Sequence, residues 1–472
     1  MYYRLKNGFV LRGWAKLNAI LIKRPENDYR ILKSHEFNLL LLCDGETDFD
    51  NFELSQQEEM AREDFLHKEI IEAASVSSPL DEDQLYKSYP NRFVDSCFWS
   101  ITGRCNFRCR HCYMDAPEGT LGELSHEDAV ELIDQMADCG VLKVDITGGE
   151  PFVRKDFWQL IDYLQSKNIT VGMIYTNGWM LTDEVLDEFE KRKLHPSFSI
   201  SFDGIGWHDW MRGVKGAEQA ALNALSLCKR RGFPMNVEMC LHKGNSGSLR
   251  ETLTQLAKIG VMDVKCSRVS DTPLWNQNSE GSGMTLQEYV DAMVDYIPKY
   301  YEDGCPVNLI LCDVAVLNKG KTEYEIVAEK RDGTEDCLNC HLCGSARFSC
   351  YISPEGRLLP CMPVTACKEQ EDFARFQDIG LRACLSDSLY MQFVDKRVKD
   401  LFAVNGKCRA CPYRLKCAGG CRAAALEQCG DLMGPDLHQC FLWENGYVEK
   451  LHQIIDEAIV KYCKKEDKED EN

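Results

Sequence analysis

The sequence predicts an α/β protein whose central part alternates strands and helices, with a small domain before it and a cysteine-rich region after it. Three observations lead to this prediction. About six strand–helix units follow one another between residues 95 and 320, which is typical of a parallel sheet covered by helices. The first 90 residues carry apolar strands and then helices. Thirteen of the 25 cysteines lie between Cys337 and Cys440.

Composition restricts the class of protein. A chain of 472 residues is too long for one ordinary domain, and 44% apolar residues suffice for several cores. The net charge of −20 argues against a nucleic-acid partner, because phosphate-binding surfaces need excess Lys and Arg. No apolar run is long enough to span a membrane, and residues 1–14 lack the apolar segment of a signal peptide, so we expect a cytoplasmic protein. In that compartment the cysteines are expected to be ligands or core residues rather than disulfides.

The first domain, residues 1–90, is predicted to hold two strands and two helices. The strands are short apolar runs, and each helix begins after a serine that can cap it. Their ranges are, in chain order, 8–14, 18–24, 35–44 and 56–74. Strands followed by helices fit a small winged-helix unit.

The middle region is predicted to alternate apolar strands with capped, amphipathic helices. The strands cover residues 97–102, 141–147, 169–176, 197–202, 235–241 and 263–269. The intervening helices cover about 126–139, 155–167, 183–193, 216–231 and 247–259, and a helix near 285–302 and a strand over 307–312 follow. Sites in such sheets form at the carboxyl ends of the strands, so we search there for functional residues.

The region from about residue 330 onward is predicted to be rich in loops. Residues 347–361 read as a hairpin that turns at Pro-Glu-Gly. Residues 386–402 and the segment after Phe441 read as helices. The charged stretch 464–472, KKEDKEDEN, is predicted to be a disordered tail.

Three cysteines lie within eight residues at the end of the first strand of the middle region. The segment CNFRCRHC places Cys105, Cys109 and Cys112 at the spacing C-x3-C-x2-C. Thiolates suit zinc and iron–sulfur clusters. A four-iron cluster held by three cysteines keeps one iron open for a substrate or cofactor, and Arg108 and Arg110 would favour an anion beside it. On these residues alone, zinc or a cluster with a fourth ligand elsewhere remains an alternative.

This octet resembles the radical SAM enzymes, and Gly148-Gly149-Glu150-Pro151 after the second strand resembles their GGEP motif. The resemblance covers about residues 95–320 and implies a partial (β/α)6 TIM-like barrel. It implies that the three cysteines hold a [4Fe–4S] cluster whose open iron binds S-adenosylmethionine. An electron from this cluster would cleave the cofactor to a 5′-deoxyadenosyl radical. Glu150 would accept a hydrogen bond from the methionine amino group.

Further cofactor contacts are expected on the following strands. Alternation places Ser199 and Ser201 on one strand face, where the resemblance implies contacts to the ribose and the methionine carboxylate. Arg212 resembles a position that reaches the carboxylate, with a surface salt bridge as the alternative, and Asn177 would line the same cavity. The predicted cofactor-binding residues are therefore Gly148, Gly149, Glu150, Asn177, Ser199, Ser201 and Arg212. No catalytic acid or base is predicted.

The downstream cysteines, over residues 330–463, resemble the SPASM extension of a subgroup of radical SAM enzymes. The pattern C-x12-G-x4-C, then C-x2-C-x5-C-x3-C, then C is matched throughout. The resemblance implies two auxiliary [4Fe–4S] clusters. It assigns to the first cluster Cys343, Cys361 and Cys421, and to the second Cys408, Cys411, Cys417 and Cys440. The fourth ligand of the first cluster stays open between Cys337, Cys340 and an open site, and a set of zinc ribbons is the alternative for the region.

Residues 1–90 resemble the RiPP recognition element, a module that pairs a leader peptide with an exposed strand edge. Together the resemblances imply a maturase of a ribosomally made precursor peptide, served by an external electron donor of the flavodoxin or ferredoxin type. A thioether from cysteine to carbon is favoured as the product over a carbon–carbon cross-link or an epimer. The alternatives are an anaerobic sulfatase maturase that forms formylglycine, and an iron–sulfur peptide-binding or electron-transfer protein that does not cleave the cofactor.

Overall fold

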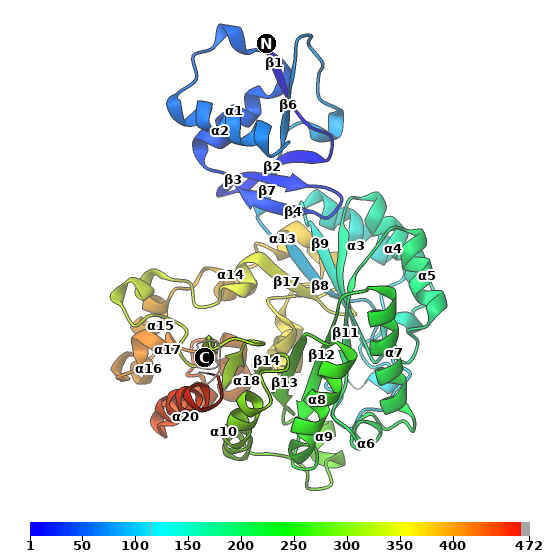
Figure 1. The fold of residues 1–472 in the computed structure, drawn as a ribbon, viewed down its shortest axis with the longest axis vertical. Coiled ribbons are helices and arrows are strands. Elements are labelled where there is room, and N and C mark those ends of the chain that lie inside the picture. Colours follow the sequence, from blue (N-terminus) through cyan, green and yellow to red (C-terminus); the bar gives the residue numbers. More distant parts are fainter. Residues whose placement is uncertain (115, 464–472) are drawn as a thin grey trace, which may run out of the picture.

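A computed structural model of the protein describes residues 1–114 and 116–463. An eleven-stranded sheet forms its centre, and the N-terminal domain contains a three-stranded and a four-stranded sheet (Figure 1). The predicted tail, 464–472, lies outside the described residues. No helix among the described residues is long and apolar enough to cross a lipid bilayer.

Seven parallel strands make up most of the central sheet, and each pairs with its successor along the chain. They are β8 (Ser96–Ser100), β9 (Lys143–Thr147), β10 (Thr170–Thr176), β11 (Ser197–Ser201), β12 (Met235–Leu241), β13 (Asp263–Arg268) and β14 (Asn308–Leu311). The longer helices between them are α3 (His126–Asp138), α4 (Phe157–Ser166), α5 (Asp183–Lys191), α7 (Ala217–Arg231), α8 (Leu249–Ile259) and α10 (Leu286–Glu302). The α/β class and the parallel sheet are confirmed, and the uninterrupted strand order fits a partial barrel rather than a doubly wound sheet.

Both ends of this row of strands are extended by other strands, so the row does not close on itself. The antiparallel strands β15 (Ala315–Leu317) and β16 (Tyr324–Ile326) follow β14. At the other end β17 (Ser349–Ile352) pairs in parallel with β8 and forms the predicted hairpin with β18 (Leu358–Leu359). The cysteine-rich region is thereby joined to the strand that precedes the first three cysteines.

The helices bury the apolar faces that their sequences predict. In α3, Leu132, Ile133 and Met136 have no exposed surface and belong to one core with Val144 and Ile146 of β9. Burying a large apolar side chain stabilises the fold by about 1.5–3 kcal/mol. Packing of this kind fixes where each strand ends, and therefore where the loops at the carboxyl edge begin.

The N-terminal domain contains seven strands where two were predicted, and its second helix is shorter than predicted. The first sheet has the order β4 (Asp28–Ile31), β3 (Leu17–Lys23), β2 (Phe9–Ala15) and β7 (Lys87–Arg92), and the second has β5 (Asp44–Asp48), β1 (Tyr2–Leu5) and β6 (Ile71–Ala74). The helices are α1 (Ser34–Leu42) and α2 (Gln56–His67). The helix predicted over 56–74 ends at His67 because Glu69 has a positive φ of 55° and the next residues pair with β1.

The N-terminal domain contacts the amino ends of the parallel strands. The indole Nε1 of Trp14 donates a hydrogen bond to the carbonyl of Cys139 at 3.0 Å. The Asn27 amide donates to the carbonyl of Leu142, just before β9, at 2.8 Å. In Figure 1 this domain (blue) adjoins the sheet near β8 and β9. It is thus attached at the edge opposite to the loop that carries the first three cysteines.

The cysteine-rich region consists of short helices. The single helix predicted over 386–402 is divided into α14 (Ser388–Asp395) and α15 (Val398–Val404). The break arises because Arg397 is extended and forms a bridge with His341. The helices after residue 436 are α19 (Leu437–Glu444) and α20 (Tyr447–Tyr462).

Candidate functional site: the cysteine loop at the carboxyl edge

The loop that carries Cys105, Cys109 and Cys112 follows β8 and is fixed on two sides by backbone hydrogen bonds. On the side of β9, the amide of Gly149 donates to the carbonyl of Thr102 at 2.9 Å, and the amide of Glu150 donates to the carbonyl of Arg104 at 2.9 Å. On the opposite side the loop is bonded to helix α6 (His208–Arg212). The amides of Arg108 and Arg110 donate to the carbonyls of Arg212 and Met211 at 3.3 and 2.9 Å.

Two glycines allow these contacts because the backbones approach closely. A Cβ on Gly149 would lie 2.1 Å from the carbonyl oxygen of Arg104 and 3.1 Å from the Cβ of Cys105. A Cβ on Gly213, which has a φ of 66°, would lie 2.3 Å from the carbonyl oxygen of Arg108. Gly149 belongs to the predicted set. Gly213 does not, although its position directly after a short helix is a recognisable stop signal.

Each of the three thiols is half-buried and lies near a nitrogen donor. The Sγ atoms of Cys105 and Cys112 are 3.4 Å from the backbone nitrogens of Phe107 and Ala116. The Sγ of Cys109 is 3.9 Å from Nη1 of Arg212. Burial, followed by the nearby acidic and thiol groups, raises the pKa of Cys105 to about 12. Such thiols become thiolate ligands when a metal replaces their protons, so this set suits a metal cluster.

Glu150 is completely buried between the ends of β9 and β10. Its carboxylate accepts hydrogen bonds from Thr176 Oγ1 at 2.9 Å, from the backbone of Asn177 at 2.8 Å and from the backbone of Phe152 at 3.3 Å. Burial raises its pKa to about 7 in spite of these donors, which favour the charged form. The structure therefore brings Glu150 and Asn177 together, and the Asn177 side chain donates to Asn106 of the cysteine loop at 2.7 Å.

The two predicted serines lie on β11, next to β10. Ser199 is 2% exposed, and its hydroxyl oxygen has no hydrogen-bond partner among the described residues. Ser201 is half-buried and lies beside Glu238 of β12. A buried hydroxyl without a partner is costly, so an additional polar group is expected to reach Ser199.

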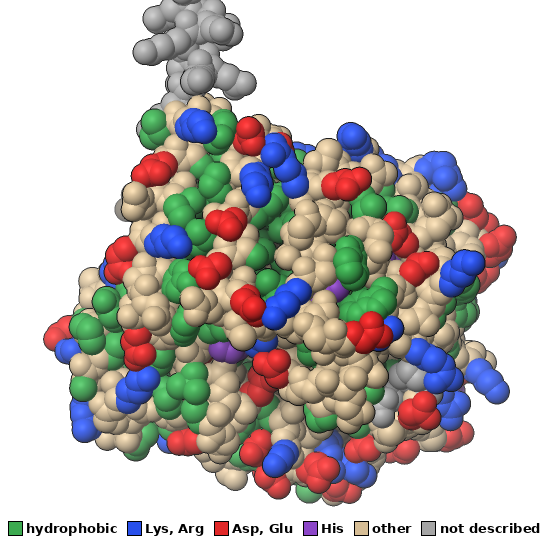
Figure 2. Space-filling view, turned by 90° about the horizontal axis from the view of Figure 1, so that it is seen from below, with side chains coloured by type: hydrophobic (Ala, Val, Ile, Leu, Met, Phe, Trp, Pro, Cys, Tyr) green, Lys and Arg blue, Asp and Glu red, His purple; other side chains and the backbone are tan. Residues whose placement is uncertain are grey.

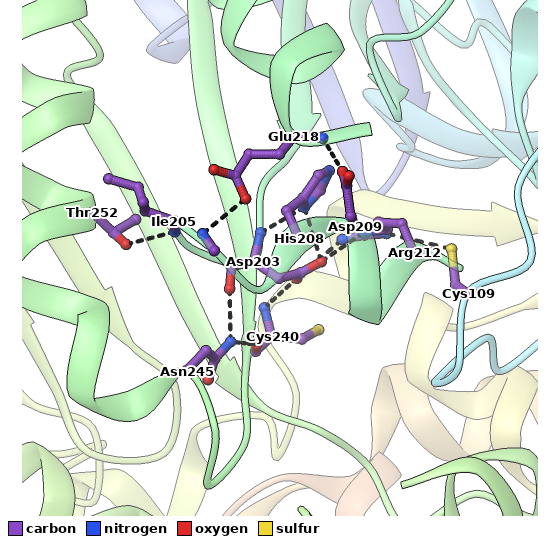
Figure 3. Close-up of polar contacts among 11 residues, drawn as sticks. Cys109, Asp203, Ile205, His208, Asp209, Arg212, Glu218, Cys240, Asn245 and Thr252 are labelled. Atoms are coloured by element: carbon purple, nitrogen blue, oxygen red, sulfur yellow. Dashed lines mark hydrogen bonds and ion pairs between the residues drawn. The ribbon is translucent and has the colours of Figure 1, made fainter. Parts of the chain in front are cut away.

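Arg212 forms a buried ion pair rather than the surface salt bridge that the sequence left as an alternative. Its Nε and Nη2 donate to the two carboxylate oxygens of Asp203 at 2.6 and 3.1 Å (Figure 3). Burial disfavours the charged carboxylate, but the positive charge of Arg212 lowers the pKa of Asp203. Sequence reasoning did not include Asp203 in the site, although it follows β11 directly.

The side chains of His111, Asp203 and Cys240 also bring possible metal ligands within 4.8 Å of one another. However, the Asp203 carboxylate already binds the Arg212 guanidinium. A cation would have to compete with that fixed positive charge, so this group is better described as part of the Arg212 ion pair.

The cysteines of the C-terminal region form separate groups. The half-buried Cys361 thiol lies near Cys421, Cys343 and Cys367. Cys421 directly precedes helix α18 (Arg422–Cys429), so this group joins segments that are far apart in the chain. The arrangement brings together the three cysteines that the resemblance assigned to the first auxiliary cluster.

A second group contains the four cysteines that the resemblance assigned to the other auxiliary cluster. Cys417 interacts with Cys440 and Cys408, and Cys408 interacts with Cys411. Burial raises the pKa of Cys417 to about 12. These four residues come from α16 (Gly406–Ala410), α17 (Arg414–Cys417), α19 and the loop between α16 and α17.

Cys337 and Cys340, the two upstream residues considered as a fourth ligand, interact with each other. Cys337 is buried in an apolar cluster that also contains Leu401 and Cys408. The cysteines near the Cys361 thiol are Cys421, Cys343 and Cys367, so the described residues do not indicate either Cys337 or Cys340 as that ligand.

Comparison with known proteins identifies the domain that contains the first site. Residues 99–256 match the Radical SAM superfamily. The AdoMet-dependent heme synthase of Methanosarcina barkeri is 25% identical over 356 residues, which cover 71% of this chain and 93% of that protein. The mycofactocin maturase MftC of Mycobacterium tuberculosis is 27% identical over 342 residues, which cover 72% of this chain and 81% of MftC.

A solved structure resembles almost the whole chain. The structure of Streptococcus suis SuiB bound to its precursor peptide SuiA matches with a TM-score of 0.62 and 15% identity, covering 92% of this chain and 98% of SuiB. At this identity the match concerns the fold. The sequence match, together with the geometry of the cysteine loop, shows that residues 99–256 form a radical SAM domain.

Proposed function

We propose that this protein is a radical SAM enzyme that modifies a ribosomally made precursor peptide. The principal observation is the arrangement of the cysteine loop. Cys105, Cys109 and Cys112 are held between the Gly149 turn and helix α6, with the Arg212 guanidinium beside Cys109. This arrangement provides three ligands for a [4Fe–4S] cluster and polar groups for a cofactor at its open iron.

The chain's own residues would bind and orient S-adenosylmethionine. Arg212 and Ser201 would contact the methionine carboxylate, and Ser199 would gain a partner in the ribose. Glu150 would accept a hydrogen bond from the amino group, while Gly148, Gly149 and Asn177 shape the loop around it. When bound, the reduced cluster supplies the electron that cleaves the sulfonium to a 5′-deoxyadenosyl radical.

Two further [4Fe–4S] clusters are proposed for the C-terminal region. Cys343, Cys361 and Cys421 would hold one, with Cys337, Cys340 or an open position as the fourth site. The second would be held by Cys408, Cys411, Cys417 and Cys440. The electrostatic contacts within each group support this division. These clusters would accept the electron left after bond formation or bind a substrate thiolate.

The N-terminal domain favours a peptide over a tetrapyrrole as the substrate. The structural match to peptide-bound SuiB covers 92% of this chain and therefore includes part of the N-terminal domain. Strand β4 lies at the edge of its sheet and exposes Tyr29 and Ile31, as required for pairing with a leader peptide. We propose residues 1–90 as the leader-binding domain and a thioether as the product, with an external flavodoxin or ferredoxin as the electron donor.

Surface charge agrees with a partner other than nucleic acid. On the face shown in Figure 2, acidic and basic side chains are interspersed, and the chain as a whole carries a net charge of −20. A phosphate-binding surface would instead require a continuous basic area.

The decisive experiment measures iron and cofactor cleavage after anaerobic reconstitution. Three four-iron clusters predict about twelve iron ions per chain, and dithionite should then release 5′-deoxyadenosine from S-adenosylmethionine. Replacing Cys105, Cys109 and Cys112 by alanine should leave about eight iron ions and abolish cleavage. The buried core residue Cys228 provides the control, since Cys228→Ala should change neither quantity. Cleavage by the triple variant would contradict the proposal.

The peptide assignment has a separate test. Deleting residues 1–90 should reduce modification of a precursor peptide far more than it reduces cofactor cleavage without peptide. Equal loss of both activities would argue against the leader-binding role. Mass spectrometry of a peptide co-expressed with the protein would separate a cross-link, which removes two hydrogen atoms, from an epimer, which leaves the mass unchanged. A cysteine thiol that no longer reacts with an alkylating reagent would then distinguish the thioether from a carbon–carbon cross-link.

A further inference from the structure

The carboxylate of Asp203 occupies the centre of a buried hydrogen-bond network. It has no exposed surface and accepts three hydrogen bonds (Figure 3). Two come from Nε and Nη2 of Arg212, at 2.6 and 3.1 Å, and the third comes from the backbone nitrogen of Cys240 at 3.0 Å. A two-point contact of this kind fixes the plane of a guanidinium group as well as its position.

The remaining terminal nitrogen of Arg212 points toward the cysteine loop. With Nε and Nη2 bound to Asp203, Nη1 lies 3.9 Å from the Sγ of Cys109. The backbone carbonyl of Arg212 also accepts a hydrogen bond from Arg108 in the same loop. Arg212 therefore joins Asp203 to the loop through both its side chain and its backbone.

A second set of contacts holds Asp203 itself in place. Its backbone nitrogen donates to Nδ1 of His208 at 2.9 Å, and its carbonyl accepts from the side chain of Asn245 at 2.8 Å. Both partners have no exposed surface. Since His208 and Arg212 are the first and last residues of α6, Asp203 is bonded to both ends of that helix.

We infer that Asp203 is a positioning residue that directs Arg212 toward the cluster and the carboxylate of S-adenosylmethionine. The inference rests on the proposed function of the cysteine loop. It assigns two consequences to Asp203. The carboxylate holds Nη1 at the cofactor face, and its negative charge offsets the positive charge of Arg212 beside Cys109. The cluster is then adjacent to a neutral pair rather than an isolated cation.

The test compares Asp203→Asn, Arg212→Met and the double variant in the reconstituted full chain, with S-adenosylmethionine as the probe. Asp203→Asn should weaken cofactor binding by about tenfold, because one charged hydrogen-bond partner is lost. It should also raise the midpoint potential of the cluster, since an uncompensated cation stabilises the more negative, reduced state. Arg212→Met should weaken binding but lower the potential, because it leaves the carboxylate alone.

The double variant distinguishes positioning from a general structural role. It removes both charges, so its potential should return toward that of the wild type, while its affinity should equal that of Arg212→Met. If Asp203→Asn fails to take up iron, the double variant can still be compared with Arg212→Met in affinity and midpoint potential. The inference is wrong if Asp203→Asn reduces affinity by the same factor in the Arg212→Met background, or if both single variants shift the potential in one direction.

A matched control is available on the outer surface. Asp162 binds Arg192 with the same two-point geometry, at 2.6 and 3.2 Å, but its side chain is 55% exposed. Asp162→Asn should change neither affinity nor potential. If the wild-type protein neither binds nor cleaves S-adenosylmethionine, the proposed function itself is wrong. If the wild type binds and cleaves it but the Asp203 variants have unchanged affinity and potential, only the role of Asp203 is wrong.

Discussion

The two cysteine regions of this protein are built in different ways. The first places three cysteines within eight residues on one loop, and backbone hydrogen bonds fix that loop to the Gly149 turn and to α6. The second brings Cys361, which follows β18, close to Cys421, which precedes α18. The first site is thus defined by a short stretch of chain held in a rigid frame, whereas the second depends on contacts between distant segments.

This difference determines which changes should harm each region. In the first region, any added atom that moves the cysteine loop away from the Gly149 turn or from α6 should reduce cofactor cleavage, even when every cysteine is retained. In the second region, replacing one cysteine should remove the iron held by its own group. The iron of the other group should remain.

The largest effect is expected for Gly149→Ala. The new Cβ would lie 2.1 Å from the carbonyl oxygen of Arg104, so the loop must move away from β9. A displacement of about 1 Å can cost about a hundredfold in rate, and we expect at least that loss in 5′-deoxyadenosine formation. The control is Gly247→Ala, because nothing lies within 4 Å of a Cβ there. Unchanged cleavage by Gly149→Ala would show that the loop does not need its frame.

The next effect concerns the grouping of the distant cysteines. Cys361→Ala and Cys417→Ala should each remove about four iron ions while cofactor cleavage without peptide continues. Combining Cys361→Ala with Cys421→Ala should remove no further iron, because both belong to one group. Combining Cys361→Ala with Cys417→Ala should remove about eight. Iron analysis of the four variants would disprove the grouping if the two double variants lost equal amounts.

A smaller, pH-dependent effect is expected for Glu150. Its pKa is raised from 4.5 to about 7, chiefly by burial, so the native state binds a proton more tightly than the unfolded state. The stability of the wild type should therefore fall as the pH rises between these values and then level off, relative to Glu150→Gln. The difference is at most about 3 kcal/mol. The free energies of unfolding of the wild type and of Glu150→Gln, measured at about pH 5 and about pH 8, give this difference. The exposed Glu251→Gln is the control, and an opposite slope would contradict the assignment.

The smallest effect is expected for Trp14→Phe, which lies far from both cysteine regions. The change removes one buried hydrogen bond to the carbonyl of Cys139, worth about 1 kcal/mol of the free energy of unfolding. Iron content and cofactor cleavage should remain unchanged, while the stability of the N-terminal domain falls. A loss of iron would show that the attachment of this domain influences the cysteine sites.

Much of the fold was predictable because it is locally encoded. The strands from β8 to β14 and the helices between them follow apolar periodicity and capping residues, such as Ser125 before α3. One predicted helix was extended too far, and another is divided in two. The stretch after His67 has helical composition, but Ile71–Ala74 pair with β1, and Arg397 interrupts a helical pattern by its bridge to His341. In both places a contact with a distant segment overrides the local preference.

Within the candidate site, the three cysteines, Gly148, Gly149 and the paired serines could be proposed from the sequence, because their spacing and strand positions are local properties and resemble those of the radical SAM enzymes. Only the folded chain decided that Arg212 is buried against Asp203 and directed at Cys109, and that Cys361 lies near Cys421. The physical reason is that hydrogen bonds and electrostatic contacts act through distance in space. Residues that are nine or sixty positions apart become partners only after the sheet has formed and the segments have packed against it.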